Sequence, residues 1–350
     1  MTDWDVVRKL EVTIEDYALE RLEQDVSSHF RRVTTVIRMR GGGQEGIGED
    51  VVYDAVDHDA AQEAGPVLPL LGHWTMEGLS NHLAGLDLFP GKEPERDVSR
   101  LYRRYGYESA ALDLALRQAG TSLHALVGRR PRPLTYVVSL RLGEPPSLDP
   151  ILSRLANYPS LRFKLDPTVS WTDELVAALA ETGAVDSVDF KGFYKGTVVD
   201  NPPDVGLYRR VVDALPDAWI EDPHLDDPVQ ELLEPHRDRV TWDAPIHGIA
   251  DIEALPFPPK MVNVKPSRVG SLKELFATYE YCDARGIAMY GGGQFELGPG
   301  RGQIQLLASL YHPDTPNDVS PSGFHSPNPP PGLPTSPIPP QADDRGFRWR

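Results

Sequence analysis

The sequence is poor in cysteine and in positive charge. Its 350 residues include one cysteine, Cys282, and 35 lysine and arginine residues against 52 aspartate and glutamate residues, a net charge of −17. A single cysteine excludes an internal disulfide and a cysteine-rich zinc site, and its helical surroundings predict a small buried side chain. The excess of negative charge argues against nucleic acid or an anionic membrane surface as a partner.

Targeting and membrane signals are also missing. The N-terminal sequence MTDWDVVRKLEVTIEDYALE lacks a basic segment followed by an apolar run, which a secretory signal requires. No apolar stretch approaches the ~20 residues that cross a bilayer. We therefore expect a cytoplasmic protein.

The second half of the chain alternates between two kinds of segment. Runs rich in β-branched and aromatic residues predict strands at residues 134–142, 161–165, 185–190, 217–222, 239–244, 260–265 and 287–292, with a short eighth near 317–320. Helical patterns occupy residues 172–183, 204–215, 228–238, 271–286 and 302–312. Thr172 predicts a helix start, and Gly183 and Gly286 predict helix ends. The alternation predicts a TIM-type (β/α)8 barrel or a modified (β/α)7β barrel over residues 131–320.

A doubly wound open sheet is the competing arrangement. It would carry a glycine-rich phosphate turn after its first strand, and none follows LTYVVSLRL at residues 134–142. The barrel is therefore the better interpretation of this half of the chain.

The two ends of the chain differ from this pattern. Residues 1–130 combine a hairpin signal around three glycines at 41–43 with a helical pattern at 107–120, and so predict an α+β domain that caps the barrel. Residues 321–350 are dense in proline. They predict either a disordered tail or an extended segment that packs on the capping domain through Phe347 and Trp349.

Polar residues end most of the predicted barrel strands, where such barrels carry their catalytic groups. Strands two to six end at Lys164, Asp189, Glu221, Asp243 and Lys265, and Gln294 and Glu296 follow strand seven. A single residue of this kind has an ordinary explanation, such as a helix cap or a solvated side chain. Three carboxylates on consecutive strands, flanked by two lysines, predict one functional site at the barrel mouth.

This set of residues suits proton abstraction next to a carboxylate. Three carboxylates, with room for water and a substrate oxygen, suit an octahedral Mg²⁺, with Mn²⁺ as an alternative. The metal would stabilise the charge that develops as the proton leaves. Burial and neighbouring positive charge would push Lys164 and Lys265 toward the neutral form that a base needs. Because strands two and six lie on opposite sides of the barrel, these lysines would face opposite sides of the substrate carbon.

At these residues the chain resembles the enolase superfamily, and within it the muconate-lactonizing subgroup. The matching segments are RFK (162–164), VDF (188–190), IEDP (220–223), WDAP (242–245), VKPSRVGSL (264–272), GIGED (46–50) and YESAALDLAL (107–116). The resemblance implies a magnesium-dependent isomerase or lyase that acts on a small carboxylate through an enediolate. It also implies a homo-oligomer and a capping domain whose loops, at Tyr17–Phe30 and Gly41–Gly48, choose the substrate.

The chain departs from the superfamily pattern at three positions. Arg162 replaces the first lysine of a Lys-x-Lys pair, and since arginine cannot deprotonate, the resemblance implies a supporting role there. Lys191 stands where an asparagine often follows the first metal ligand, and Ala244 stands where a glutamate often follows the third. With Gln294 and Glu296, Arg162 and Lys191 are the expected supporting or substrate-binding residues.

The resemblance leaves several reactions open. No histidine occurs between His247 and His312, so the base of mandelate-racemase-type members after strand seven is missing. Dipeptide epimerases carry Asp-x-Asp at strand eight, where this chain has Asp318-Val319-Ser320. Racemisation or epimerisation, cycloisomerisation and syn-elimination remain. Residues 296–320 are similar to the ending of the o-succinylbenzoate synthase and N-acylamino acid racemase group.

Two functions from other classes fit the sequence less well. A catalytically silent barrel that binds a carboxylate ligand or a partner would not need a second lysine at the site. A zinc hydrolase on this fold would need a His-x-His after the first strand, and residues 134–144 contain no histidine. The sequence therefore favours the enzyme.

Overall fold

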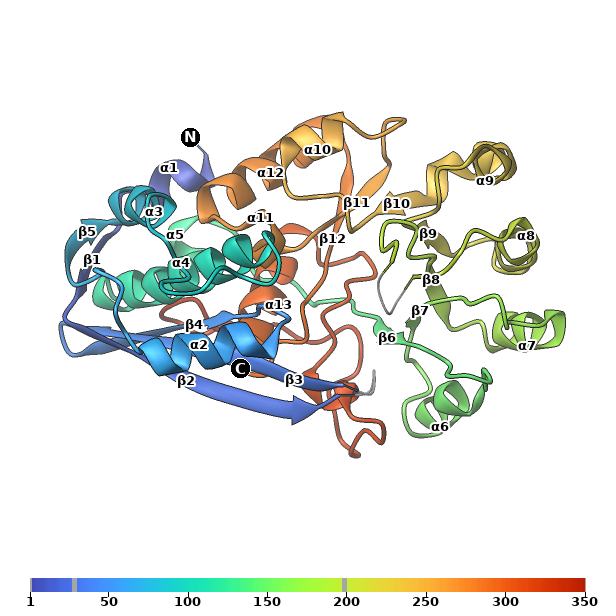
Figure 1. Ribbon diagram of the computed structural model, residues 1–350, viewed down its shortest axis with the longest axis horizontal. Coiled ribbons are helices and arrows are strands. Elements are labelled where there is room, and N and C mark those ends of the chain that lie inside the picture. The colour runs from blue at the N-terminus through green and yellow to red at the C-terminus, as the bar shows by residue number, and fades with distance from the viewer. Residues whose placement is uncertain (1, 27–29, 197–199, 350) are drawn as a thin grey trace.

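We describe the protein from a computed structural model that covers residues 2–26, 30–196 and 200–349. Two parts lie side by side in it, an antiparallel module built from the first third of the chain and a curled parallel sheet with its helices (Figure 1). The predicted fold class, a modified barrel with an N-terminal capping domain, is confirmed.

Seven parallel strands form the barrel sheet, and their spatial order is their order in the chain. They are β6 (Val138–Leu140), β7 (Phe163–Leu165), β8 (Val185–Asp189), β9 (Trp219–Glu221), β10 (Val240–Trp242), β11 (Met261–Val264) and β12 (Ala288–Gly291). Each lies within one of the seven predicted strand segments. Most of their residues are buried on both faces, as expected for a parallel sheet covered by helices.

The gap between the first and last strands is bridged by single residues instead of a full eighth strand. Asn317 pairs with Tyr136 ahead of β6, and Asp318 pairs with Gly292 after β12, both in parallel. The predicted first strand is shorter than expected, because Leu134 pairs in antiparallel fashion with Ile338 from the tail. Residues 317–318 therefore join the two edges of the curled sheet.

Helices follow the strands and cover the outside of the sheet. They are α6 (Asp149–Asn157), α7 (Asp173–Thr182), α8 (Val205–Ala214), α9 (Asp227–Leu233), α10 (Ile249–Glu253), α11 (Pro266–Val269), α12 (Leu272–Arg285) and α13 (Pro299–Tyr311), with 3-10 turns at Glu234–Arg239 and Ser322–His325. The Thr172 hydroxyl caps α7, and Gly183 and Gly286 end α7 and α12 with φ of 60° and 66°, as predicted. Cys282 is buried in α12. Across the part of the chain that is described, we find no helix with the length and apolar character of a bilayer span.

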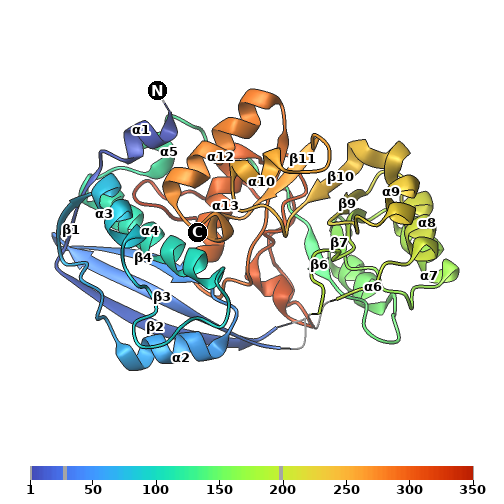
Figure 2. The ribbon, with the colours of Figure 1, turned by 45° about the horizontal axis from the view of Figure 1, so that its top comes forward.

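The capping module combines a three-stranded antiparallel sheet, β2-β3-β4, and a two-stranded one, β1-β5, with helices against them (Figure 2). Its elements are α1 (Asp3–Val7), β1 (Glu11–Ile14), β2 (Asp16–Asp25), β3 (Arg31–Gly41), β4 (Gln44–Asp50), α2 (Ala55–Ala64), β5 (Gly72–Thr75), α3 (Met76–Ala84), α4 (Ser99–Gln118) and α5 (Leu123–Leu126). The predicted hairpin is β3 and β4, joined through Gly42 and Gly43 with φ of 56° and 70°. The expected loop at Tyr17–Phe30 is mainly strand β2; its residues 27–29 lie outside the described part.

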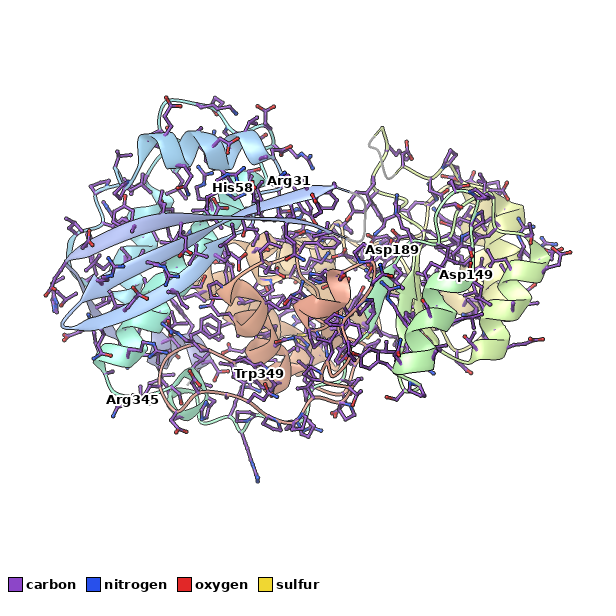
Figure 3. The ribbon with its side chains drawn as sticks, turned by 90° about the horizontal axis from the view of Figure 1, so that it is seen from below. Arg31, His58, Asp149, Asp189, Arg345 and Trp349 are labelled. Carbon is purple, nitrogen blue, oxygen red and sulfur yellow. The ribbon has the colours of Figure 1, made fainter. Side chains whose placement is uncertain are left out.

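The proline-rich tail returns to the capping module. Gly346 forms a bridge with Ser122, and the Phe347 amide donates a 2.8 Å hydrogen bond to the buried carboxylate of Asp113 in α4. Phe347 and Trp349, the two aromatic residues proposed as anchors, are buried. Figure 3 labels Trp349 against the helices at the centre of the molecule. The tail thus contacts the first part of the chain, as the extended alternative predicted.

Candidate metal centre and active site

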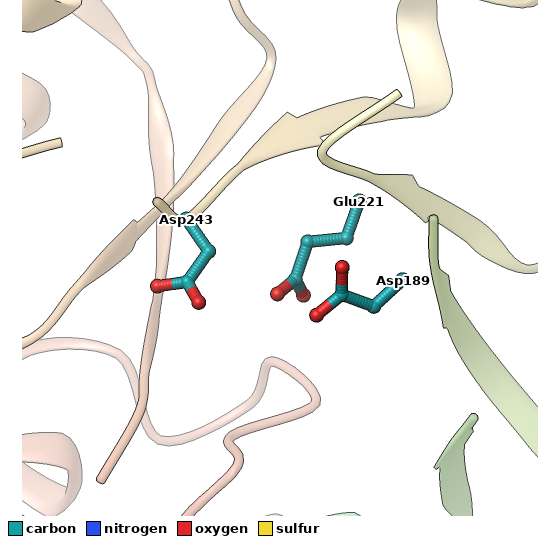
Figure 4. Close-up of side chains that lie close together, drawn as sticks. All are labelled: Asp189, Glu221 and Asp243. Carbon is teal, nitrogen blue, oxygen red and sulfur yellow. The ribbon is translucent and has the colours of Figure 1, made fainter. Parts of the chain in front are cut away.

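Three carboxylates come together at the C-terminal ends of adjacent barrel strands. Asp189 and Glu221 are the last residues of β8 and β9, and Asp243 follows β10. Parallel pairing sets Asp189 directly beside Glu221. One oxygen from each of the three side chains lies within 4.8 Å of the others, and all three residues are buried. Figure 4 shows them reaching from neighbouring strands toward a common space.

The carboxylate cluster (Asp189, Glu221 and Asp243) fits a divalent ion. Oxygens bound to one Mg²⁺ at ~2.1 Å lie at most about 4.2 Å apart, so small side-chain adjustments would suffice here. An all-oxygen ligand set of this charge suits Mg²⁺ or Mn²⁺. Burial of three carboxylates without a strong cation would be unfavourable, and each of them contacts a basic side chain of the chain itself.

Lys164, from β7, is the basic residue at one side of the cluster. Its ammonium pairs with Glu221 Oε1 and lies 3.3 Å from Asp189 Oδ2 and 3.6 Å from Asp318 Oδ2. Burial works to lower the pKa of Lys164, but Glu221 and Asp189 outweigh it and raise this pKa well above its usual value. The neighbouring Glu221 and Asp189 carboxylates therefore favour the cationic form of Lys164, and the prediction that this lysine is pushed toward neutrality is wrong.

Lys265 lies at the other side, directly after β11. Its ammonium is 2.8 Å from Asp243 Oδ2, and the Arg268 guanidinium is 2.6 Å from Asp243 Oδ1. Burial lowers the pKa of Lys265, the Asp243 carboxylate raises it, and Arg268 and Lys164 lower it further, with a net lowering. Lys164 therefore holds its proton more strongly than Lys265, because its ammonium faces more carboxylates.

Burial and the neighbouring basic side chains also shift the pKa values of the three carboxylates. Burial would raise the pKa of Asp189, but Lys191 and Lys164 lower it to about 2. Asp243 is also buried, and Arg268 and Lys265 hold its pKa well below the usual range. Burial dominates at Glu221 and raises its pKa well above normal. The cluster is therefore balanced mainly by cationic side chains of the protein.

Lys191 enters the site from the loop after β8. Its ammonium pairs with Asp189 Oδ2 and lies 3.5 Å from Asp166 Oδ1. Lys191 has a φ of 58°, a left-handed conformation that is uncommon for a residue with a Cβ atom. Its position in the site agrees with the expected supporting role.

Several polar residues around the cluster were not predicted from the sequence. Asp222 accepts hydrogen bonds of 2.8 Å from the backbone amides of Asp243 and Ala244, and burial raises its pKa to about 7. The Tyr290 hydroxyl, on β12, donates a 2.7 Å hydrogen bond to Glu221. Asp222 follows Glu221 in IEDP, so its place at a strand end was a usable signal. Inward alternation along the last strand could have indicated Tyr290.

The structure corrects the prediction for Arg162. This residue precedes β7, and its guanidinium pairs with Asp186 and with the Gly183 carbonyl at the start of β8. Those partners lie at the N-terminal ends of the strands, so Arg162 does not join the cluster. Gln294 and Glu296 are buried in the loop after β12, where the backbone N–H of Gln294 donates a 2.6 Å hydrogen bond to the Glu296 carboxylate.

A small hollow includes Asp318, whose Oδ2 lies 3.6 Å from the Lys164 ammonium. It is lined by Val138, Ser139, Gly293, Phe295, Arg301, Asp318, Ser320 and His325. From the capping module, the Phe30 ring packs edge-on against Phe295 with ring centres 5.6 Å apart. The Arg32 guanidinium donates a 3.1 Å hydrogen bond to the Gln294 carbonyl. The capping module therefore reaches the loop that borders this hollow.

The expected substrate loop at Gly41–Gly48 is placed elsewhere. Gly46 and Gly48 lie on β4 and pack against the backbone of α4. Most of residues 41–48 are therefore strand and not loop, and their expected part in choosing the substrate stays a prediction. The capping module contacts the barrel through Ile47, whose carbonyl accepts a 2.7 Å hydrogen bond from the Gln303 side chain of α13, and through Glu49, Phe30 and Arg32.

Two family models match the chain. One is described as the N-terminal domain of a domain of unknown function (DUF8230) and covers residues 5–126. The other is described as the C-terminal domain of the same family and covers residues 130–326.

Curated relatives include an N-succinylamino acid racemase from Thermus thermophilus, 25% identical over 86% of this chain and 81% of the relative. An N-succinylamino acid racemase from Amycolatopsis is 37% identical over 24% of this chain, and an o-succinylbenzoate synthase from Bacillus subtilis is 40% identical over 18% of it. These two alignments span only 27% and 17% of the relatives' own length.

Solved structures show the same fold. An enolase-superfamily member from Listeria innocua has a TM-score of 0.65 at 19% identity, covering 89% of this chain and 86% of the other. The muconate lactonizing enzyme of Pseudomonas putida has a TM-score of 0.61 at 20% identity, covering 97% and 94%. A dipeptide epimerase from Methylococcus capsulatus, solved with a Mg ion, has a TM-score of 0.62 at 20% identity, covering 90% and 88%.

Proposed function

Since this chain belongs to the DUF8230 family and shares its fold with structures of the enolase superfamily, we propose that it is an isomerase or lyase of that superfamily and removes the α-proton of a small carboxylate in a Mg²⁺-dependent reaction. One observation carries the proposal. Two buried lysines, Lys164 and Lys265, flank a cluster of three buried carboxylates at the barrel mouth. A site built only to bind an anion would not require that many carboxylates.

Lys164 and Lys265 are the proposed acid–base pair. They come from β7 and from the end of β11, which have β8, β9 and β10 between them in the sheet. A substrate carbon between the two ammonium groups would have one of them on each face. One lysine, as the neutral amine, would take the α-proton at its Nζ, leaving an enediolate, and the other, as the ammonium, would return a proton. The lowered pKa of Lys265 supports it as the group that takes the proton.

Asp189, Glu221 and Asp243 are the proposed ligands of Mg²⁺, with Mn²⁺ as an alternative. When bound, the metal would stabilise the negative charge that develops on the substrate carboxylate. Asp222 fixes the backbone at Asp243 through two hydrogen bonds, and Tyr290 holds Glu221, so the ligands keep their directions.

Buried polar atoms beside Lys265 and in the loop after β12 support a polar substrate. Both amide atoms of Asn263 and Nε2 of Gln294 are buried without a hydrogen-bond partner among the described residues. Such groups are expected to gain partners from a bound ligand, because leaving them unpaired is costly. Two relatives are named N-succinylamino acid racemases and one an o-succinylbenzoate synthase. N-Succinylamino acids and related dicarboxylates are therefore the substrates to test first.

The test is exchange of the α-proton for deuterium in D₂O with Mg²⁺, over a panel of N-acylamino acids and succinyl compounds. The native protein is expected to exchange at least one acid. Lys164→Met or Lys265→Met should reduce the exchange by a factor of about 10² or more, as expected for removal of an acid–base group. Arg162→Met is the matched control, because Arg162 is a basic side chain near the same strand that does not reach the cluster.

The competing function, a silent barrel that binds a carboxylate ligand or a partner, gives a different result. It predicts binding of one of the acids without exchange, and unchanged binding kinetics in Lys164→Met. That outcome would show that the protein binds a carboxylate ligand and does not catalyse proton abstraction. A cytoplasmic location and a homo-oligomeric state stay predictions from the sequence.

A further inference from the structure

Lys191 touches the carboxylate cluster without a part in the proton transfer described above. Its backbone amide donates a 3.1 Å hydrogen bond to Asp189 Oδ1, and its ammonium pairs with Asp189 Oδ2. One residue thus contacts both oxygens of a proposed metal ligand. The inference below rests on the proposed function, because it concerns the same metal site.

The left-handed backbone at Lys191 is held in place from both sides. The Gly192 amide donates a 2.8 Å hydrogen bond to the Asp222 carbonyl, and the Tyr194 amide donates to the Lys191 carbonyl at 3.0 Å. A Cβ atom at Gly192 would lie 2.7 Å from the backbone of His224, so this turn fits tightly against the next strand end. The backbone of Lys191 is therefore fixed, while its flexible side chain can still move the ammonium group.

A second carboxylate lies next to the Lys191 ammonium. Asp166 Oδ1 is 3.5 Å away, and Asp166 Oδ2 accepts a 2.9 Å hydrogen bond from the Arg141 side chain. Asp166 follows β7 and is buried, but it is not one of the three clustered metal ligands. The ammonium can therefore exchange one carboxylate partner for another with a small movement of its stem.

We propose that Lys191 is a tethered competitor of the divalent ion: its ammonium neutralises Asp189 in the metal-free protein and moves onto Asp166 when the ion binds. A divalent cation and an ammonium on the same carboxylate repel each other strongly at the short distances of a buried site. Metal binding must therefore displace the ammonium from Asp189, and this displacement weakens the affinity of the site for the ion. Asp166 reduces that penalty because it offers the ammonium another partner.

The test is the affinity for Mn²⁺, measured from the electron paramagnetic resonance signal of free Mn²⁺ without substrate. Lys191→Met is expected to bind Mn²⁺ about tenfold more tightly than the native protein, because the competing charge is gone. Asp166→Asn is expected to bind it several-fold more weakly, because the ammonium then has no alternative carboxylate. Lys195→Met, which removes an exposed lysine from the same loop, should leave the affinity unchanged.

The double variant separates competition from a general change in charge. If Asp166 acts only through Lys191, then Lys191→Met with Asp166→Asn should bind Mn²⁺ as tightly as Lys191→Met alone. Equal or weaker binding in folded Lys191→Met would overturn the inference, and should that variant not fold, equal or tighter binding in Asp166→Asn would do so. If neither the native protein nor Lys191→Met bound Mn²⁺, the proposed metal site would fall together with the inference. If the native protein bound Mn²⁺, Asp189→Asn abolished this binding and Lys191→Met left it unchanged, then only the inference about Lys191 would be wrong.

Discussion

At the scale of single residues, His312 shows how a buried ionisable group links stability to pH. It follows α13, and its Nδ1 lies 2.7 Å from the Asn317 side-chain oxygen, so Nδ1 carries the proton of that hydrogen bond. Its Nε2 is buried without a hydrogen-bond partner in the described part of the chain. Burial lowers the pKa of His312 to about 4, because a second proton would have no acceptor.

The pH dependence follows from that lowered pKa. The folded protein binds the His312 proton less readily than the unfolded chain, so the contribution is complete above a pH of ~6.5 and is lost as the pH falls toward 4. At pH 5 the loss is expected to be about 2 kcal/mol. Urea unfolding of the native protein and of His312→Gln at pH 7 and pH 5 measures it. If the free energy of unfolding changed with pH by the same amount in the two proteins, His312 would not be the source of this pH dependence.

At the scale of elements, the packing of β4 on α4 depends on two glycines. Gly46 and Gly48 point to the same side of the strand, and Gly106, Ala110 and Leu114 recur every four residues on the facing side of the helix. A Cβ atom on Gly46 would lie 2.3 Å from the Leu114 amide, and one on Gly48 would lie 2.2 Å from the Gly106 carbonyl. The strand can approach the helix backbone only without side chains there.

Gly46→Ala is expected to lower the free energy of unfolding by about 2–4 kcal/mol, because strand and helix must separate to admit the methyl group. The matched control is Gly248→Ala, where the backbone is extended and nothing lies within 4 Å of the added carbon. That control should stay within about 0.5 kcal/mol of the native value. Chemical denaturation measures the free energy of unfolding of both variants. Equal values would show that strand β4 and helix α4 can separate at little cost.

At the scale of the whole molecule, Glu49 joins the capping module to the barrel. Its buried carboxylate accepts hydrogen bonds from the amides of Leu297 at 2.7 Å and of Gly300 at 2.9 Å, and also binds the Gly298 amide. These amides lie where the loop after β12 becomes helix α13. A carboxylate at the first turn of a helix is favourable for the helix dipole as well as for the free amides. The same loop carries Gly293 and Phe295, which line the hollow that includes Asp318.

Glu49→Ala should therefore loosen this loop as well as reduce stability. Three amides lose their acceptor, and we expect a loss of about 2–5 kcal/mol in the free energy of unfolding. Hydrogen exchange at Gly298 and Gly300 should become faster. Glu45→Ala is the control on the same strand, since its partly exposed ion pairs contribute about 1 kcal/mol or less. Unchanged exchange at residues 297–300 would speak against this role of Glu49.

The sequence by itself determined the order of the barrel and the meeting of its strand ends. Alternating strand and helix patterns lead to parallel strands whose C-terminal ends share one edge, so residues far apart in the chain had to converge. That geometry brings Lys164, Asp189, Glu221, Asp243 and Lys265 together, as predicted, while their catalytic and metal-binding roles stay predictions. The limits of the domains at residues 130 and 320 also remain predictions.

Only the tertiary structure decided what each of these groups faces. Arg162 is two residues before Lys164, yet it pairs with Asp186, because its side chain lies at the opposite end of the strand from the site. Lys164 stays cationic and Lys265 has a lowered pKa because the first faces more carboxylates than the second. Periodicity fixes which residues share an edge of a sheet. Charge balance and side-chain partners depend on contacts between distant segments, and no local pattern encodes them.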